Sequence, residues 1–150
     1  MLSIRIDYLM GCAYAGDFGD RSVAEWPPHP ARFFSATVSA LHDGQNRAEE
    51  RAALQWLAEQ GLPDVYATNS TERSALEAYV VTNYEGKSGS PVPDARDKQK
   101  RYSPAVRPDL PTAYFIWPTA DPDGRTRNAL ERLLQRVGYL GRSHSAVAMS

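Results

Sequence analysis

The segment from residue 123 to residue 149 constrains the fold most strongly, because three patterns follow one another within it. A helical face is predicted by apolar residues at the i, i+3, i+4, i+7 spacing: Leu130, Leu133, Leu134 and Val137. Gly138 follows, where a helix commonly ends in a left-handed glycine. The loop 138–145 then leads into an apolar run over 146–149. The segment therefore predicts a helix, a glycine loop and a terminal strand.

The rest of the chain supplies the other elements of a small α+β fold. Alternating apolar and polar residues over 2–8 predict a strand with one buried face. A helix is predicted from Pro30 to His42, because proline suits a first helical turn. Further predicted elements are an extra helix over 46–60, a strand over 76–84 and a strand over 113–117. With the extra helix set aside, the order is βαββαβ, the ferredoxin-like arrangement that RNA-recognition domains also use.

Composition excludes several classes of protein. The chain has 150 residues, 42% hydrophobic and 23% charged, which is ordinary for one globular domain. Cys12 is the only cysteine, so neither an internal disulfide nor a cysteine-based zinc site can form. No metal-ligand spacing, cofactor motif, secretion signal or membrane-length apolar run is visible. We expect a cytoplasmic protein without metal or cofactor.

Charge is distributed unevenly along the chain, although the formal net charge is only −1. Residues 43–77 carry seven acidic and three basic side chains, whereas residues 85–107 carry six basic and three acidic ones. Residues 125–142 contain five arginines and one glutamate. This asymmetry suits an acidic ligand on the second half of the chain, and solvated surface charge is the alternative. The basic connection over 85–111 is long enough to predict a binding loop or a mobile one.

Three blocks of sequence together resemble one CRISPR-associated family. They are Glu25–Phe34 (EWPPHPARFF), Tyr114–Pro118 (YFIWP) and Val137–Ser143 (VGYLGRS). The chain resembles the fused subunit of type I-G (formerly I-U) systems, in which a Cas-five-like domain precedes a Cas-six-like domain. The resemblance spans nearly all of the chain and implies a ferredoxin-like fold of the repeat-associated (RAMP) superfamily. It also implies that residues 1–150 form the Cas-five-like domain, with 85–111 as a basic thumb-like insertion.

The resemblance further implies a place in a crRNA-guided surveillance (Cascade) complex. There a Cas-five-like domain holds the five-prime handle of the crRNA and meets the backbone and large subunits. The sequence stops at Ser150, where the family's second domain would follow. We therefore expect a fragment or a split subunit, with a Cas-six-like domain in cis or in trans. Because repeat-RNA cleavage is usually assigned to that domain, its catalytic residues cannot be carried onto this chain.

The candidate RNA-binding residues combine cations, an aromatic ring beside them, and glycine backbone. Basic groups hold phosphates, and aromatic rings stack on bases. In the basic insertion the candidates are Lys98, Lys100, Arg101, Tyr102 and Arg107. In the glycine loop they are Gly138, Tyr139, Gly141, Arg142 and Ser143. Arg32, at the start of the first predicted helix, is a further candidate for phosphate contact.

Two alternative functions remain open from the sequence. A metal-independent endoribonuclease acting on repeat RNA needs a proton-transfer group, and His144 beside the glycine loop is the best candidate. The other alternative is a protein-interaction module whose basic insertion docks on an acidic partner. We expect a binding function without catalysis in this chain.

Overall fold

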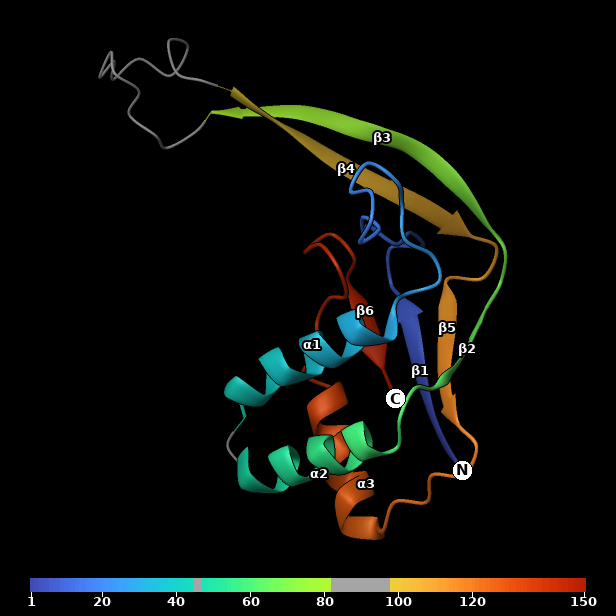
Figure 1. Ribbon diagram of the computed structural model, residues 1–150, viewed down its shortest axis with the longest axis vertical. Coiled ribbons are helices and arrows are strands. Elements are labelled where there is room, and N and C mark those ends of the chain that lie inside the picture. The colour runs from blue at the N-terminus through green and yellow to red at the C-terminus, as the bar shows by residue number, and fades with distance from the viewer. Residues whose placement is uncertain (45–46, 82–97) are drawn as a thin grey trace, which may run out of the picture.

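The computed structural model describes residues 1–44, 47–81 and 98–150, with the backbone alone at 74–76. Its elements are β1 (Leu2–Tyr8), α1 (Pro30–His42), α2 (Arg47–Glu59), β2 (Asp64–Ala67), β3 (Ser70–Val81), β4 (Lys98–Pro108), β5 (Thr112–Trp117), α3 (Gly124–Leu134) and β6 (Val147–Met149). Figure 1 shows the helices on one side of a small sheet, with β3 and β4 extending away from it.

The main sheet has four antiparallel strands in the order β2-β5-β1-β6. The βαββαβ order is made by β1, α1, β2, β5, α3 and β6, with α2 as the extra helix. Strands β5 and β1 are central, and β2 and β6 lie at the edges. This is the ferredoxin-like topology, and it confirms the predicted fold class.

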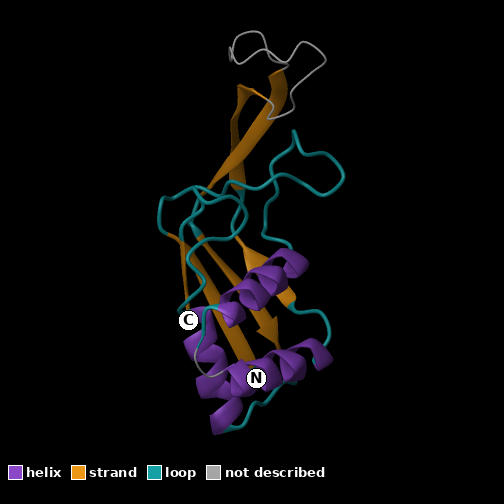
Figure 2. Cartoon of the chain, turned by 90° about the vertical axis from the view of Figure 1, so that its left-hand side faces the viewer, coloured by secondary structure: helices purple, strands orange, loops and turns teal. Residues whose placement is uncertain are grey.

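The core lies between the sheet and the helices. Along β1 the even-numbered residues are buried, and the odd-numbered ones point to the opposite, open face. Phe33 from α1 packs edge-on against Phe115 from β5, with ring centroids 5.0 Å apart. Leu130, Leu133 and Leu134 bury the inner face of α3. The helices therefore cover one face of the sheet and leave the other open (Figure 1), and Figure 2, viewed from the helix side, shows them in front of the strands.

Among the described strands, β3 and β4 pair with each other and form a two-stranded antiparallel ribbon. The ribbon is inserted between β2 and β5, which are themselves paired in the main sheet. At its base, Val106 exchanges two backbone hydrogen bonds with Ala13, both 3.0 Å long. The ribbon is therefore anchored to the core at one end and projects from it (Figure 1).

The structure corrects three expectations about these elements. The second strand of the main sheet is β2, not the segment 76–84, whose described part belongs to the ribbon. The described part of the expected loop 85–111 contains the long strand β4. Residues 85–97 of that expected loop lie outside the described residues, as do Asn46 of the predicted extra helix and residues 82–84 of the predicted strand. Helix α3 ends at Leu134 with Gln135 as its C-cap, and Gly138 does not have a positive φ.

Candidate functional site

The glycine loop, residues 138–145, is fixed against the segment around Tyr14. Gly141 has a φ of 95°, and a Cβ added there would lie 2.7 Å from the carbonyl oxygen of Tyr14. Only glycine accommodates both the left-handed conformation and this close approach. The fully buried Ser145 accepts a 2.6 Å hydrogen bond at Oγ from the Tyr14 amide. The loop is therefore a held structure, with Leu140 and Ser145 inside and Tyr139, 53% exposed, outside.

Arg142 connects the glycine loop to the ribbon. Its backbone amide donates to the carbonyl of Tyr14 over 2.9 Å, which fixes the main chain. Its side chain donates from Nη2 to the carbonyl oxygen of Tyr102 on β4. Two groups of candidate residues that are far apart in the sequence are therefore brought together at one point.

A hollow of about 290 Å³ lies beside this connection. It is lined by residues 15–18, Arg21, Arg32, Gly141 and Arg142. The Arg32 guanidinium lies over the Phe18 ring, 5.2 Å from its centroid. The hollow thus places three arginines and an exposed aromatic ring around the glycine loop, which suits an anionic or aromatic ligand.

Arg32 already has a strong internal partner. Its Nε and Nη2 donate to the two carboxylate oxygens of Glu25, over 2.8 and 2.9 Å, and Nη2 also donates to the carbonyl of Gly16. The hydrogen bond to Glu25 raises the pKa of Arg32 above its ordinary value. The His29 ring meanwhile accepts from the Ala31 amide and caps α1. Arg32 therefore holds the loop that precedes α1, and the helix N-terminus is satisfied internally.

One side of the ribbon carries lysines and tyrosines, and we call it the ribbon face: Tyr79, Lys98, Lys100 and Tyr102, with Glu77 as the cross-strand partner of Tyr102. Strand alternation places the three β4 residues on one side, and Tyr79 is the direct cross-strand partner of Lys100. The ammonium of Lys100 lies 4.8 Å from the centroid of the Tyr102 ring and pairs with Glu77 over 2.8 Å. The hydrogen bond to Glu77 raises the pKa of Lys100. Arg101 and Arg107 occupy the other side of β4.

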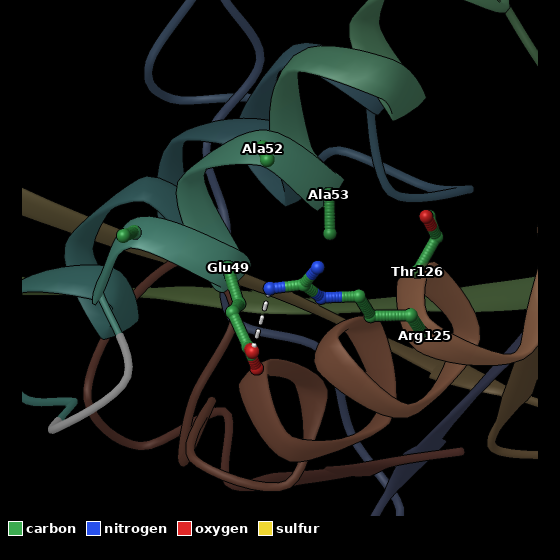
Figure 3. Close-up of a pocket in the computed structure, with 6 residues that line it drawn as sticks. Glu49, Ala52, Ala53, Arg125 and Thr126 are labelled. Atoms are coloured by element: carbon green, nitrogen blue, oxygen red, sulfur yellow. Dashed lines mark hydrogen bonds and ion pairs between the residues drawn. The ribbon is translucent and has the colours of Figure 1, made fainter.

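Several arginines of the basic segment 125–142 serve the fold instead of forming an open surface. Arg136 donates to both carboxylate oxygens of Glu50, which is only 1% exposed. Arg125 and Arg132 pair with Glu49, over 3.0 and 2.9 Å, and Figure 3 shows the Arg125–Glu49 contact between α2 and α3. The charge asymmetry of the sequence is therefore partly cancelled where α2 and α3 meet. From that segment, Arg142 reaches the described part of the ribbon.

The family follows from a comparison with models of known protein families. The model described as "CRISPR-associated protein, GSU0054 family" matches residues 3–148, which is nearly the whole sequence.

The chain belongs to this family.

Membership gives the protein a CRISPR-associated role, and the topology is compatible with the RAMP fold. A search of curated proteins found no match.

His144, the candidate for catalysis, is exposed and has one aromatic neighbour. Its ring lies edge-on to Tyr14, with centroids 5.8 Å apart. Within the described ranges, no group of three or more His, Cys, Asp or Glu side chains could hold a metal ion. In the same part of the chain, no helix has the length and apolarity needed to cross a membrane.

Sequence reasoning missed Tyr79 as a candidate. It lies in an apolar run, Ala78–Val81, which resembles a buried strand. In the structure Tyr79 is 63% exposed and stands opposite Lys100. The signal for the exposure of Tyr79 was the row of basic residues in β4. A strand that pairs with a charged strand has little apolar surface against which to bury its own side chains.

Proposed function

We propose that this chain is a non-catalytic RNA-binding component of a type I CRISPR surveillance (Cascade) complex. It acts as the Cas-five-like domain of a type I-G system and holds the five-prime handle of the crRNA. The protein family and the ferredoxin-like topology support this proposal. The observation that carries it is the ribbon face of lysines and tyrosines, connected by Arg142 to the glycine loop.

The chemistry of the ribbon face fits single-stranded RNA. Lys98 and Lys100 supply positive charges for phosphates, and Tyr79 and Tyr102 supply rings for bases. Arg142 and Arg21 extend the positive surface into the hollow beside the glycine loop. A strand of RNA that follows the ribbon towards the core would therefore meet Lys98 first, then Lys100 with Tyr79 opposite it, and then Tyr102.

The partners follow from the same assignment. The projecting ribbon is suited to insertion between neighbouring subunits, and the backbone and large subunits are the proposed neighbours. A Cas-six-like domain, in cis or in trans, is the proposed source of repeat-RNA cleavage. A cytoplasmic location fits this role.

The test compares two double variants that each remove two positive charges. Lys98→Ala/Lys100→Ala alters the ribbon face, whereas Arg51→Ala/Arg127→Ala alters exposed positions on α2 and α3. Binding of fluorescent cognate repeat RNA is measured over a series of salt concentrations without divalent metal. The ribbon variant is expected to flatten the slope of log K against log salt by about 1.4, since each phosphate contact contributes about 0.7. The helix variant is expected to keep the slope of the unaltered chain.

Equal slopes for both variants would overturn RNA binding by the ribbon face. The RNA itself is expected to remain intact on a denaturing gel. Cleavage that is lost in His144→Ala would assign the chain to the endoribonucleases instead.

A further inference from the structure

A row of three side chains crosses the open face of the main sheet. Tyr66 on β2 is the direct cross-strand partner of Tyr114 on β5, which is in turn the partner of Arg5 on β1. Directly opposite residues on neighbouring antiparallel strands point to the same face and lie close together. Tyr66 is 56% exposed, Tyr114 is 37% exposed, and the Arg5 side chain is 52% exposed. The row is therefore a flat, accessible strip of two rings and one guanidinium.

The row forms the floor of a hollow of about 540 Å³. The remaining lining comes from residues 65, 67 and 68 of the β2 edge and from residues 110–112. Thr68 holds residues 110–112 in place, because its Oγ1 accepts a hydrogen bond from the Leu110 amide over 3.0 Å and donates one to the Leu110 carbonyl over 3.2 Å. The hollow lies where β4 passes into β5, at the base of the ribbon.

The neighbours of the row favour a nucleobase over a protein surface. The adjacent row contains Asp7 and Thr112, and Asp7 accepts from Arg5 Nε over 3.0 Å and from the Thr112 hydroxyl over 2.7 Å. The contact with Asp7 uses the Nε of Arg5 and orients its guanidinium. Exposed aromatic rings on a sheet, flanked by an oriented cation and small polar groups, are a platform for unstacked bases. Aspartate is depleted at protein interfaces relative to the rest of the surface, whereas Asp7 lies beside this row and contacts Arg5.

We propose that Tyr66, Tyr114 and Arg5 form a second nucleic-acid site, which stacks one or two bases of a single-stranded RNA. The site lies on the face of the sheet opposite the helices, separate from the ribbon face and the glycine loop. It rests on the proposed function in that the chain binds single-stranded RNA. The rings supply stacking, and Arg5 supplies a hydrogen-bonding or stacking cation beside them.

The test uses the full chain and two fluorescent RNAs of about 12 nucleotides, within the site sizes of single-strand binders. One RNA carries all its bases, and the other is abasic throughout, so that both have the same phosphate charge. Tyr66→Ala/Tyr114→Ala is expected to bind the base-containing RNA about 5- to 150-fold more weakly than the unaltered chain. The same variant is expected to bind the abasic RNA as the unaltered chain does. Its salt dependence is expected to be unchanged, because no phosphate contact is removed.

Tyr66→Phe/Tyr114→Phe is the matched control, since it keeps both rings and removes only the hydroxyls. It is expected to bind both RNAs as the unaltered chain does, and thermal unfolding checks that each variant folds. Equal binding of base-containing RNA by the alanine variant and the unaltered chain overturns the site and leaves the face for a partner domain. An equal loss of affinity for both RNAs also overturns the site, because the loss of base stacking cannot weaken the binding of an abasic RNA.

The ribbon variant Lys98→Ala/Lys100→Ala separates this inference from the proposed function. A flattened salt slope in that variant, together with unaltered binding in the tyrosine variant, contradicts the sheet site alone. Absence of RNA binding by the unaltered chain contradicts both proposals.

Discussion

Arg142 and Tyr102 are 40 residues apart in the sequence, and a hydrogen bond from Nη2 of Arg142 to the Tyr102 carbonyl joins them. One residue lies in the glycine loop and the other on β4. Because Gly141 holds the loop against Tyr14, Arg142 cannot shift without disturbing a close backbone contact. The position of the middle of β4 is therefore coupled to the loop that follows α3.

Replacement of Arg142 tests whether it contacts RNA as well as the ribbon. Arg142→Ala is expected to weaken binding of repeat RNA and to flatten the salt slope by about 0.7, the contribution of one phosphate contact. Arg127→Ala, which removes an exposed arginine on α3, is the control and is expected to change neither quantity. Weaker binding at an unchanged slope would show that Arg142 only positions the ribbon.

Alanine is expected to destabilise the chain at Gly141 but not at Gly138. Gly141→Ala places a Cβ 2.7 Å from a backbone oxygen at a φ of 95°, so a loss of about 1–3 kcal/mol in the free energy of unfolding is expected. At Gly138 a Cβ meets nothing within 4 Å, so Gly138→Ala is expected to stay within about 0.5 kcal/mol of the unaltered chain. Chemical denaturation of the two variants measures both values. A larger loss at Gly138 would contradict the description of the loop.

The buried carboxylate of Glu50 makes Arg136 important for stability. Arg136→Ala leaves that carboxylate without its two-point partner, and a loss of about 3 kcal/mol in the free energy of unfolding is expected. Arg125→Ala breaks an exposed pair with Glu49 and is expected to cost less than about 1 kcal/mol. Urea denaturation of both variants provides the comparison. Equal losses would mean that burial of Glu50 does not govern the effect.

Asp123 gives helix α3 a pH-dependent cap. Its carboxylate accepts from the Thr126 amide over 2.7 Å, and this backbone hydrogen bond lowers the pKa of Asp123 below its ordinary value. Because the folded state has the lower pKa, the stabilisation is complete above the unfolded pKa and is lost as the pH falls through the folded one. Asp123→Asn keeps a capping side chain that does not titrate.

Melting temperatures measured from pH 7 down to about pH 2 test this cap. The unaltered chain is expected to lose more stability than Asp123→Asn over the acidic part of the range, with the two curves parallel near neutral pH. Curves that remain parallel throughout would show that Asp123 does not contribute in its charged form.

The sequence predicted the parts of the fold in which an apolar periodicity meets the core. Helix α1 matches its predicted bounds, and β1 and α3 bury the residues that the patterns indicated. The short strand β2 was not predicted, because its four residues follow Gly61 and Pro63 and expose most of their surface. A strand of that length has no period to detect, and its pairing with β5 defines it.

The ribbon could not be predicted from local patterns for a different reason. Pro104 within a basic segment indicated a loop, but the cross-strand register passes over Pro104 opposite the irregularity between Arg73 and Leu76. A proline is tolerated at such a bulge because no ladder hydrogen bond is required from it. The candidate site residues chosen from the sequence stay a prediction, although the structure brings Arg142 and Tyr102 into contact. The sequence did not show that Arg32 is neutralised by Glu25, because that pairing depends on how the loop before α1 folds back.

The insertion of the ribbon between two paired strands makes its reach adjustable. Both of its strands leave the sheet side by side, so adding two residues to each would lengthen the projection by about 6.6 Å without altering a single contact of the core. A change in the length of this one element would therefore alter how far the ribbon projects, while the body that carries it stays the same.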